Sequence, residues 1–164
     1  MEAEKQELNQ LYGHKLRIRV CGICIDNDQI LLVRHKAVGP ENIFWSPPGG
    51  GMQFGENAHA ALIREFQEET GLTVEVGEML FVNELILPPL HAVEIFFRVK
   101  ITSGSLLKGY DPEFSDSNQI LEEARFMSMQ EIGTLPDTHT HNLFRKCKTL
   151  NEVLALRGYM VNEG

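Results

Sequence analysis

The stretch GGMQFGENAHAALIREFQEETGL, residues 50–72, decides the fold and the chemistry that this sequence predicts. Residues 57–70 favour helix, and their apolar members recur at spacings of three and four, as in a helix with one buried face: Ala58, Ala61, Leu62 and Phe66. Gly71 supplies a helix stop, because glycine adopts the left-handed conformation without a steric penalty. The pattern therefore predicts an amphipathic helix that follows a glycine-rich turn.

Carboxylates crowd one edge of the buried face of this predicted helix. At about 100° per residue, Glu69 lies roughly 40° to one side of Glu65, and Glu68 lies roughly 60° to the other side. A solvated helix usually pairs its acids with lysines, but Arg64 is the single arginine or lysine in residues 50–72, and it can reach Glu68. Like charges repel strongly at low dielectric, so a divalent cation is expected among them. Oxygen ligands at this density favour Mg²⁺, with Mn²⁺ as the alternative.

The glycines before the helix form the second feature of this stretch. Gly49, Gly50 and Gly51 follow two prolines, so residues 47–51 are predicted to form a turn that no helix can cross. Glycine lets the backbone approach a ligand closely at the start of a helix. We therefore predict that these three glycines bind the substrate.

Strands and further helices are predicted on both sides of this stretch. Apolar runs and alternations predict strands at residues 16–25, 29–34, 43–46, 74–86, 91–101 and 123–129. Residues 1–15 are predicted as a polar lead-in, residues 103–118 as a long loop, and residues 138–157 as a C-terminal helix. The chain is thus predicted to be a single α+β domain over residues 1–164.

Charge and composition exclude several classes of partner. The net charge is -8 and the sequence has no basic stripe, which argues against a nucleic-acid partner. No apolar run has the length of a membrane span or the form of a signal peptide. Cys21, Cys24 and Cys147 form no disulfide framework, and Cys21 and Cys24 would point to opposite faces of one strand. We therefore expect a cytoplasmic protein that uses a cation to bind an anionic small molecule.

Nine spaced positions resemble the Nudix family. Every position of the Nudix box, G-x5-E-x7-R-E-U-x-E-E-x-G-U with U an apolar residue, is matched: Gly50, Glu56, Arg64, Glu65, Phe66, Glu68, Glu69, Gly71 and Leu72. The resemblance implies a Nudix α/β/α sandwich with a mixed β-sheet, and a metal-dependent pyrophosphohydrolase. Its substrate would be a nucleoside diphosphate linked to another moiety, such as ADP-ribose. The alternatives are a MutT-type nucleoside triphosphate pyrophosphohydrolase and a non-catalytic nucleotide-sensing domain.

The resemblance also implies roles for residues of the box and a homodimeric assembly. Glu68 and Glu69 would be the principal metal ligands, and Glu65 would be a further ligand or the base that activates water. Arg64 would orient a glutamate. Gly50 would contribute its backbone to the metal or phosphate site.

Members of this family often use a further acid from outside the box. Four candidates lie in the predicted long loop and before the last predicted strand: Glu113, Asp116, Glu122 and Glu123. We favour Glu123 as the additional catalytic residue, because it begins a strand from which the sheet could direct it towards the helix.

Overall fold

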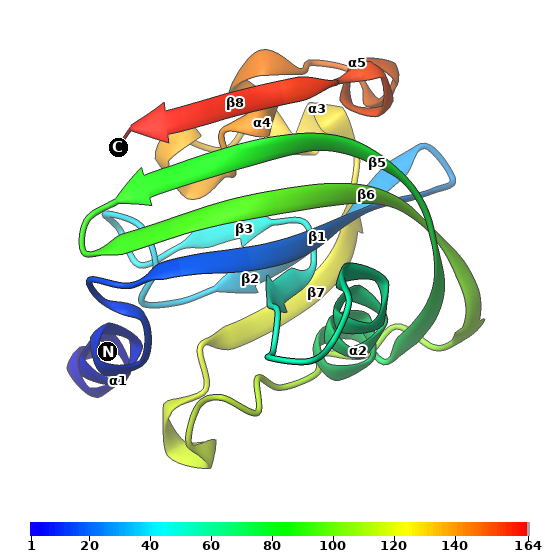
Figure 1. Ribbon diagram of the computed structural model, residues 1–164. Coiled ribbons are helices and arrows are strands. Elements are labelled where there is room, and N and C mark those ends of the chain that lie inside the picture. Colours follow the sequence, from blue (N-terminus) through cyan, green and yellow to red (C-terminus); the bar gives the residue numbers. More distant parts are fainter. Residues whose placement is uncertain (164) are drawn as a thin grey trace.

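The computed structural model describes residues 1–163, and its strands form one mixed sheet (Figure 1). The strands are β1 Leu16–Asp26, β2 Gln29–His35, β3 Phe44–Ser46, β4 Gly49–Gly51, β5 Leu72–Leu87, β6 Leu90–Gly104, β7 Leu121–Met127 and β8 Gly158–Glu163. Their order is β3-β2-β1-β6-β5-β8, with β4 paired to β1 and β7 paired to β2. The β1–β6 and β5–β8 pairs are parallel, and the other pairs are antiparallel. The predicted α+β class with a mixed sheet is confirmed.

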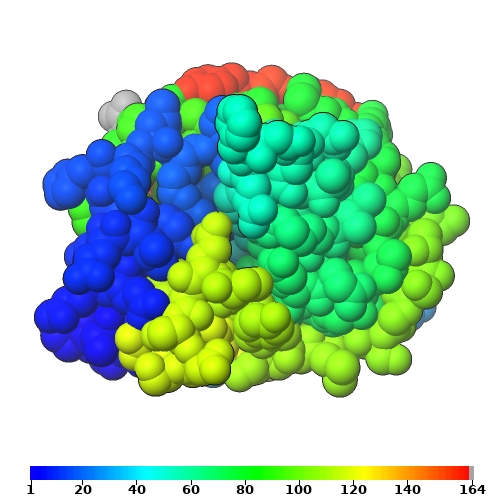
Figure 2. Space-filling model, turned by 60° about the horizontal axis from the view of Figure 1, so that its bottom comes forward, coloured from blue at the N-terminus to red at the C-terminus, as the bar shows by residue number. Residues whose placement is uncertain are grey.

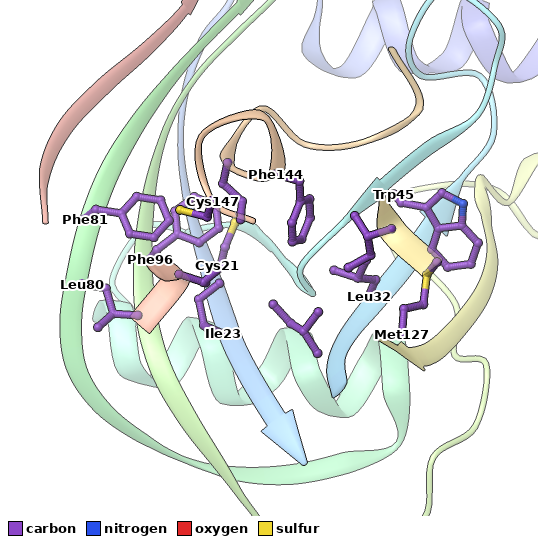
Figure 3. Close-up of a cluster of buried hydrophobic side chains, with 14 of the residues drawn as sticks. Cys21, Ile23, Leu32, Trp45, Leu80, Phe81, Phe96, Met127, Phe144 and Cys147 are labelled. Atoms are coloured by element: carbon purple, nitrogen blue, oxygen red, sulfur yellow. The ribbon is translucent and has the colours of Figure 1, made fainter. Parts of the chain in front are cut away.

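Helices cover both faces of the sheet. Helix α2, Ala58–Thr70, packs on one face, and three short helices pack on the other: α3 Met129–Ile132, α4 Leu143–Lys146 and α5 Leu150–Ala155 (Figure 1). Neighbouring residues of β2 point to opposite faces, so Leu31 contacts the cluster of Leu62 and Phe66, whereas Leu32 joins the cluster of Phe144 (Figure 3). The alternation of apolar residues along the strands thus builds two cores.

The predicted helix of the central stretch is confirmed with both of its ends. The Asn57 side chain accepts a hydrogen bond from the Ala60 backbone N–H at 2.9 Å, which caps the N-terminus of α2. Gly71 takes the left-handed conformation with φ 70° and ends the helix. The turn at residues 47–51 also contains β4, which pairs Gly50 with Val20 of β1 and so places the glycines against the sheet.

The prediction of one C-terminal helix over residues 138–157 is wrong. The chain forms a short 3-10 helix, Asp137–His139, then α4 and α5, and it ends in the unpredicted strand β8. Cys147 is extended, and Thr149 starts α5 by a capping box with Glu152. Apolar residues from both short helices still pack into one cluster, which is why their spacing imitates a single helix.

The N-terminal segment is more than a polar lead-in. Helix α1, Glu2–Tyr12, buries Leu8 and Tyr12 against Phe114 and Ile120 of the long loop. The ammonium group of Lys36, which follows β2, contacts the Glu4 carboxylate of α1 at 2.8 Å. No helix among the described residues is long and apolar enough to cross a membrane.

Gly22 of β1 should not tolerate a side chain. A Cβ atom there would lie 2.4 Å from the fully buried Phe66 ring of α2. We expect Gly22→Ala to lower the free energy of unfolding by about 1–3 kcal/mol, because overpacking forces α2 away from the sheet. Urea unfolding measures this change. Gly133→Ala is the matched control, since its Cβ would lie no closer than 3.3 Å to any neighbour. Equal losses in both variants would contradict the prediction.

Candidate active site

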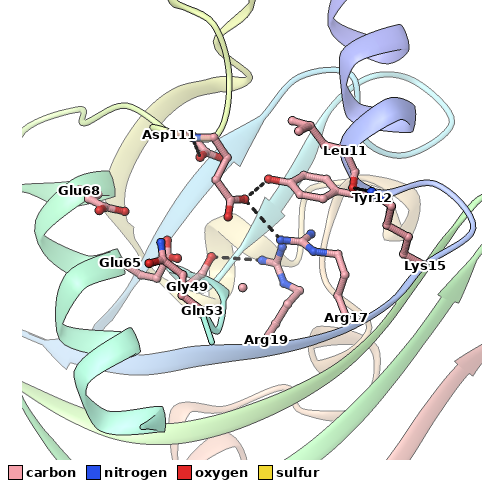
Figure 4. Close-up of polar contacts among 12 residues, drawn as sticks. Leu11, Tyr12, Lys15, Arg17, Arg19, Gly49, Gln53, Glu65, Glu68 and Asp111 are labelled. Carbon is pink, nitrogen blue, oxygen red and sulfur yellow. Dashed lines mark hydrogen bonds and ion pairs between the residues drawn. The ribbon is translucent and has the colours of Figure 1, made fainter. Parts of the chain in front are cut away.

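A cavity lies where α2, β4 and the face of the sheet meet. Figure 2 shows the outer border of this region, where α1 in blue, the loop around residue 115 in yellow and α2 in teal lie side by side. Glu65 and Glu69 of α2 line the cavity together with the glycines of β4 and two arginines of β1: Gly49, Gly50, Gly51, Arg17 and Arg19. Figure 4 shows Glu65 of α2, Asp111 of the long loop and the two arginines of β1, all of which line this cavity. One cavity thus holds carboxylates and guanidinium groups together.

Glu69 is held in place by the glycine turn. Its side chain is 4% exposed, and its Oε2 atom accepts a hydrogen bond from the Gly49 backbone N–H at 2.9 Å. Its Oε1 atom lies 3.4 Å from Nε2 of His35, which comes from β2. The turn and the helix, which are adjacent in sequence, therefore fix one buried carboxylate in the cavity.

Glu65 lies directly beneath the glycine turn. A Cβ atom at Gly50 would lie 2.4 Å from the Glu65 carboxylate, so a glycine is required here for the two to approach. Burial and the charge of Glu69 raise the pKa of Glu65 to about 8. This pair of buried acids is the kind of arrangement that a cation stabilises.

Arg64 contacts three glutamates and the turn at once. Its Nη2 atom donates to Glu56 at 2.7 Å and to the Gly51 carbonyl at 3.1 Å. Its Nη1 atom donates to Glu65 at 2.8 Å and to Glu68 at 3.1 Å. The guanidinium group therefore sets the positions of these carboxylates relative to the turn.

Comparison with known proteins identifies the family. The chain matches the NUDIX domain over residues 15–146. It belongs to the Nudix family. It is 33% identical over 124 residues to the ADP-ribose pyrophosphatase of Methanocaldococcus jannaschii, which covers 71% of this chain and 72% of that protein. It is 31% identical over 85 residues to the 8-oxo-dGTP diphosphatase of Proteus vulgaris, covering 52% of this chain and 76% of that protein.

The fold agrees with this assignment. A NUDIX hydrolase from Nitrosomonas europaea superimposes with a TM-score of 0.66 at 21% identity, over 81% of this chain and 86% of that chain. Members of the family are pyrophosphohydrolases that require divalent cations. The chain is therefore a Nudix hydrolase, and its box helix is the expected place for the cation.

The carboxylates of the Nudix box fit a hard cation by their chemistry. Within residues 1–163, no three His, Cys, Asp or Glu side chains are arranged closely enough to hold a metal as they stand. Arg64 engages Glu65 and Glu68, and Glu69 bonds to the Gly49 backbone. The burial of Glu65 beside Glu69 nevertheless leaves a like-charge repulsion that a divalent cation would remove. The donor set, all of it oxygen, suits Mg²⁺ or Mn²⁺.

The structure does not bring Glu123 to the cavity. Its side chain is 43% exposed on β7, within 3.8 Å of the Arg34 guanidinium and 3.3 Å of the Arg125 guanidinium. Strand register places Glu123 opposite Arg34 of β2, and its contacts with Arg34 and Arg125 hold its side chain outside the cavity. Two acids of the long loop line the cavity instead, Asp111 and the earlier candidate Glu113.

Several residues of the site were not predicted from the sequence. Arg17 and Arg19 are two residues apart on β1, so their side chains lie on the same face of the strand. This spacing is visible in the sequence, but the sequence does not show which face of the strand lines the cavity. Arg19 donates to the Gly49 carbonyl at 3.1 Å, and the Arg17 guanidinium stacks 3.5 Å above the centre of the Tyr12 ring. Tyr12 in turn donates to the Glu113 carboxylate, which closes the border between α1 and the loop (Figure 4).

Proposed function

We propose that this chain hydrolyses a nucleoside diphosphate linked to another moiety, as in ADP-ribose, with Mg²⁺ as the cation. The observation that carries the proposal is the pairing of acids and arginines in one cavity: Glu65, Glu69, Arg17 and Arg19. A diphosphate needs cationic groups along its oxygens, and guanidinium groups match phosphate oxygens in geometry as well as charge. The similarity to an ADP-ribose pyrophosphatase supports the same substrate class.

The residues of the Nudix box would hold the cation. Glu65, Glu68 and Glu69, with the backbone of Gly50, are the proposed ligands, and Mn²⁺ is the proposed alternative to Mg²⁺. When bound, the cation supplies Lewis acidity towards a phosphoryl oxygen and lowers the pKa of its bound water.

Other groups of the chain would position the substrate. The backbone of Gly49, Gly50 and Gly51 approaches the phosphates closely because no side chain intervenes. The guanidinium groups of Arg17 and Arg19, on the neighbouring strand β1, bind the phosphate oxygens beside these glycines. Arg64 keeps the glutamates in position through its four contacts. Glu65, where it is not a ligand, accepts the proton of the attacking water.

A substrate panel tests this function. ADP-ribose, sugar nucleotides, dinucleoside polyphosphates and nucleoside triphosphates would be incubated with Mg²⁺, Mn²⁺ or a chelator, and the products identified. We expect ADP-ribose to yield AMP and ribose 5-phosphate only in the presence of the cation. Release of pyrophosphate from triphosphates alone would favour the MutT-type alternative, in line with the 8-oxo-dGTP diphosphatase of Proteus vulgaris. Binding without any product would favour the sensing domain.

The homodimer and the cytoplasmic location stay predictions, which sedimentation and cell fractionation test.

A further inference from the structure

A row of polar side chains runs from the cavity into the interior of the protein. Strand register places Arg19 of β1 opposite Glu94 of β6, and Glu94 opposite Asn83 of β5. His141, from the segment before α4, completes the row. Glu94 is 4% exposed and His141 is 1% exposed. A buried carboxylate destabilises the folded protein unless it is hydrogen-bonded, and Glu94 is hydrogen-bonded within this row.

The two oxygens of Glu94 have different surroundings. Oε2 accepts hydrogen bonds from Asn83 Nδ2 at 2.9 Å and from His141 Nε2 at 2.8 Å. The Leu143 backbone N–H donates to His141 Nδ1 at 3.2 Å, which places the proton of a neutral imidazole on Nε2 and makes it the donor to Glu94. Oε2 therefore already accepts two hydrogen bonds.

The second oxygen, Oε1, retains acceptor capacity. It lies 3.5 Å from Nε of Arg19, which is buried and has no hydrogen-bond partner, and the Glu94 side chain lines the cavity. Burial raises the pKa of Glu94, but the hydrogen bonds from His141 and Asn83 and the charge of Arg19 outweigh this and hold the pKa below its usual value. An ionised carboxylate thus lines the cavity, and its Oε1 atom, which lies beside the Arg19 guanidinium, can accept a further hydrogen bond.

The cavity becomes apolar next to Glu94. Ala92 lies two residues along the same face of β6, and its register partner Leu85 of β5 lines the cavity beside it. Leu90, Val38 and Phe44 continue this apolar wall. Ala92 is a small residue among larger ones in this lining, so it leaves room for a flat ring at this place.

We propose that this apolar end binds the base of the substrate, and that Oε1 of Glu94 accepts a hydrogen bond from an exocyclic amino group of that base. The inference rests on the proposed function and adds that the base of the substrate carries an exocyclic amino group. Adenine, cytosine and guanine each carry an amino group that can donate one hydrogen bond to Oε1, and Oε2 already accepts hydrogen bonds from Asn83 and His141. A carboxylate only accepts hydrogen bonds, so an oxo group of uracil at this place would be repelled. The apolar wall favours a ring over the hydroxyls of a ribose.

Equilibrium binding tests the inference without any turnover. The affinity of the wild-type chain for ADP would be compared by calorimetry with that for purine riboside 5′-diphosphate, which lacks the 6-amino group alone. We expect ADP to bind at least about tenfold more tightly, because the analogue leaves Glu94 without its partner. Equal affinities, or no measurable affinity for either compound, would overturn the inference. If 2′-deoxy-ADP bound more weakly than ADP while the purine analogue bound equally well, the contact would belong to a ribose hydroxyl. That result would also overturn the inference.

Two variants separate recognition from stability. In Glu94→Gln we expect the ratio of the two affinities to fall to within about threefold, because a neutral amide no longer demands a donor. Glu78→Gln is the matched control: Glu78 is an exposed glutamate that contacts Arg157 at 3.3 Å, and neither residue lines the cavity, so the ratio of the two affinities should equal that of the wild type. An unchanged ratio in Glu94→Gln would contradict the assignment.

The second variant tests the place of the ring and does not alter the buried charges. Ala92→Leu fills the apolar end, and we expect it to weaken ADP binding at least about tenfold through steric exclusion. Wild-type affinity in a folded Ala92→Leu variant would overturn the base subsite. Cleavage of ADP-ribose with no preference for the amino group would refute this inference alone, whereas failure of the whole substrate panel would refute the proposed function.

Discussion

Replacement of Glu69 by glutamine is expected to lower kcat by at least about a thousandfold, because the substitution removes a charge that the cation and the reacting phosphate both require. Glutamine keeps the shape of the side chain and can still accept the hydrogen bond from the Gly49 backbone N–H, now 2.9 Å. The fold should therefore survive. Steady-state kinetics at saturating Mg²⁺ and ADP-ribose measure the loss, and urea unfolding verifies that the variant is folded.

The matched control for this variant is Glu78→Gln. Glu78 is an exposed glutamate whose carboxylate lies 3.3 Å from Arg157 and does not line the cavity. Its replacement should leave kcat within about twofold, since exposed ion pairs contribute little. If Glu69→Gln retained more than about a tenth of the wild-type kcat, a role of Glu69 in charge stabilisation of the reaction would be contradicted.

Replacement of Arg64 is expected to produce the second large effect. Alanine would leave Glu56, Glu65 and Glu68 without the guanidinium group that now contacts all three between 2.7 and 3.1 Å. We expect kcat to fall about a hundredfold or more, because misplacement of the carboxylates disturbs the positions of the reacting groups. The site is partly exposed, so the expected loss in the free energy of unfolding is smaller than for a buried pair, about 1–3 kcal/mol.

Arg64→Lys separates positioning from stability. Lysine keeps the positive charge but cannot make the planar, four-acceptor contact of a guanidinium group. We expect kcat to fall at least about tenfold while KM and the urea midpoint change little. Arg125→Ala, whose guanidinium contacts Glu123 and Glu131 at the surface, serves as the control for loss of an arginine. A lysine variant with wild-type kcat would show that Arg64 has a structural role and does not position the glutamates for catalysis.

The elements that the sequence predicted correctly are those with local causes. Asn57, the apolar spacing and Gly71 determine α2, because capping, helical periodicity and the left-handed conformation act within a few residues. Strand alternation likewise placed Cys21 and Cys24 in separate clusters on opposite faces of β1. The C-terminal prediction failed because the spacing of apolar residues cannot distinguish one helix from two short helices that pack on the same core.

The site divides in the same way. The Nudix box alone determined that carboxylates crowd one helix edge, that Arg64 can reach Glu68, and that a glycine-rich turn precedes them, since these groups are neighbours along one chain segment. Only the tertiary structure decided that Arg17, Arg19 and Glu94 complete the cavity and that Asp111 and Glu113 lie there in place of Glu123. The physical reason is strand pairing. The β1–β6 register and the path of the long loop join residues far apart in sequence, and local propensities carry no information about such contacts.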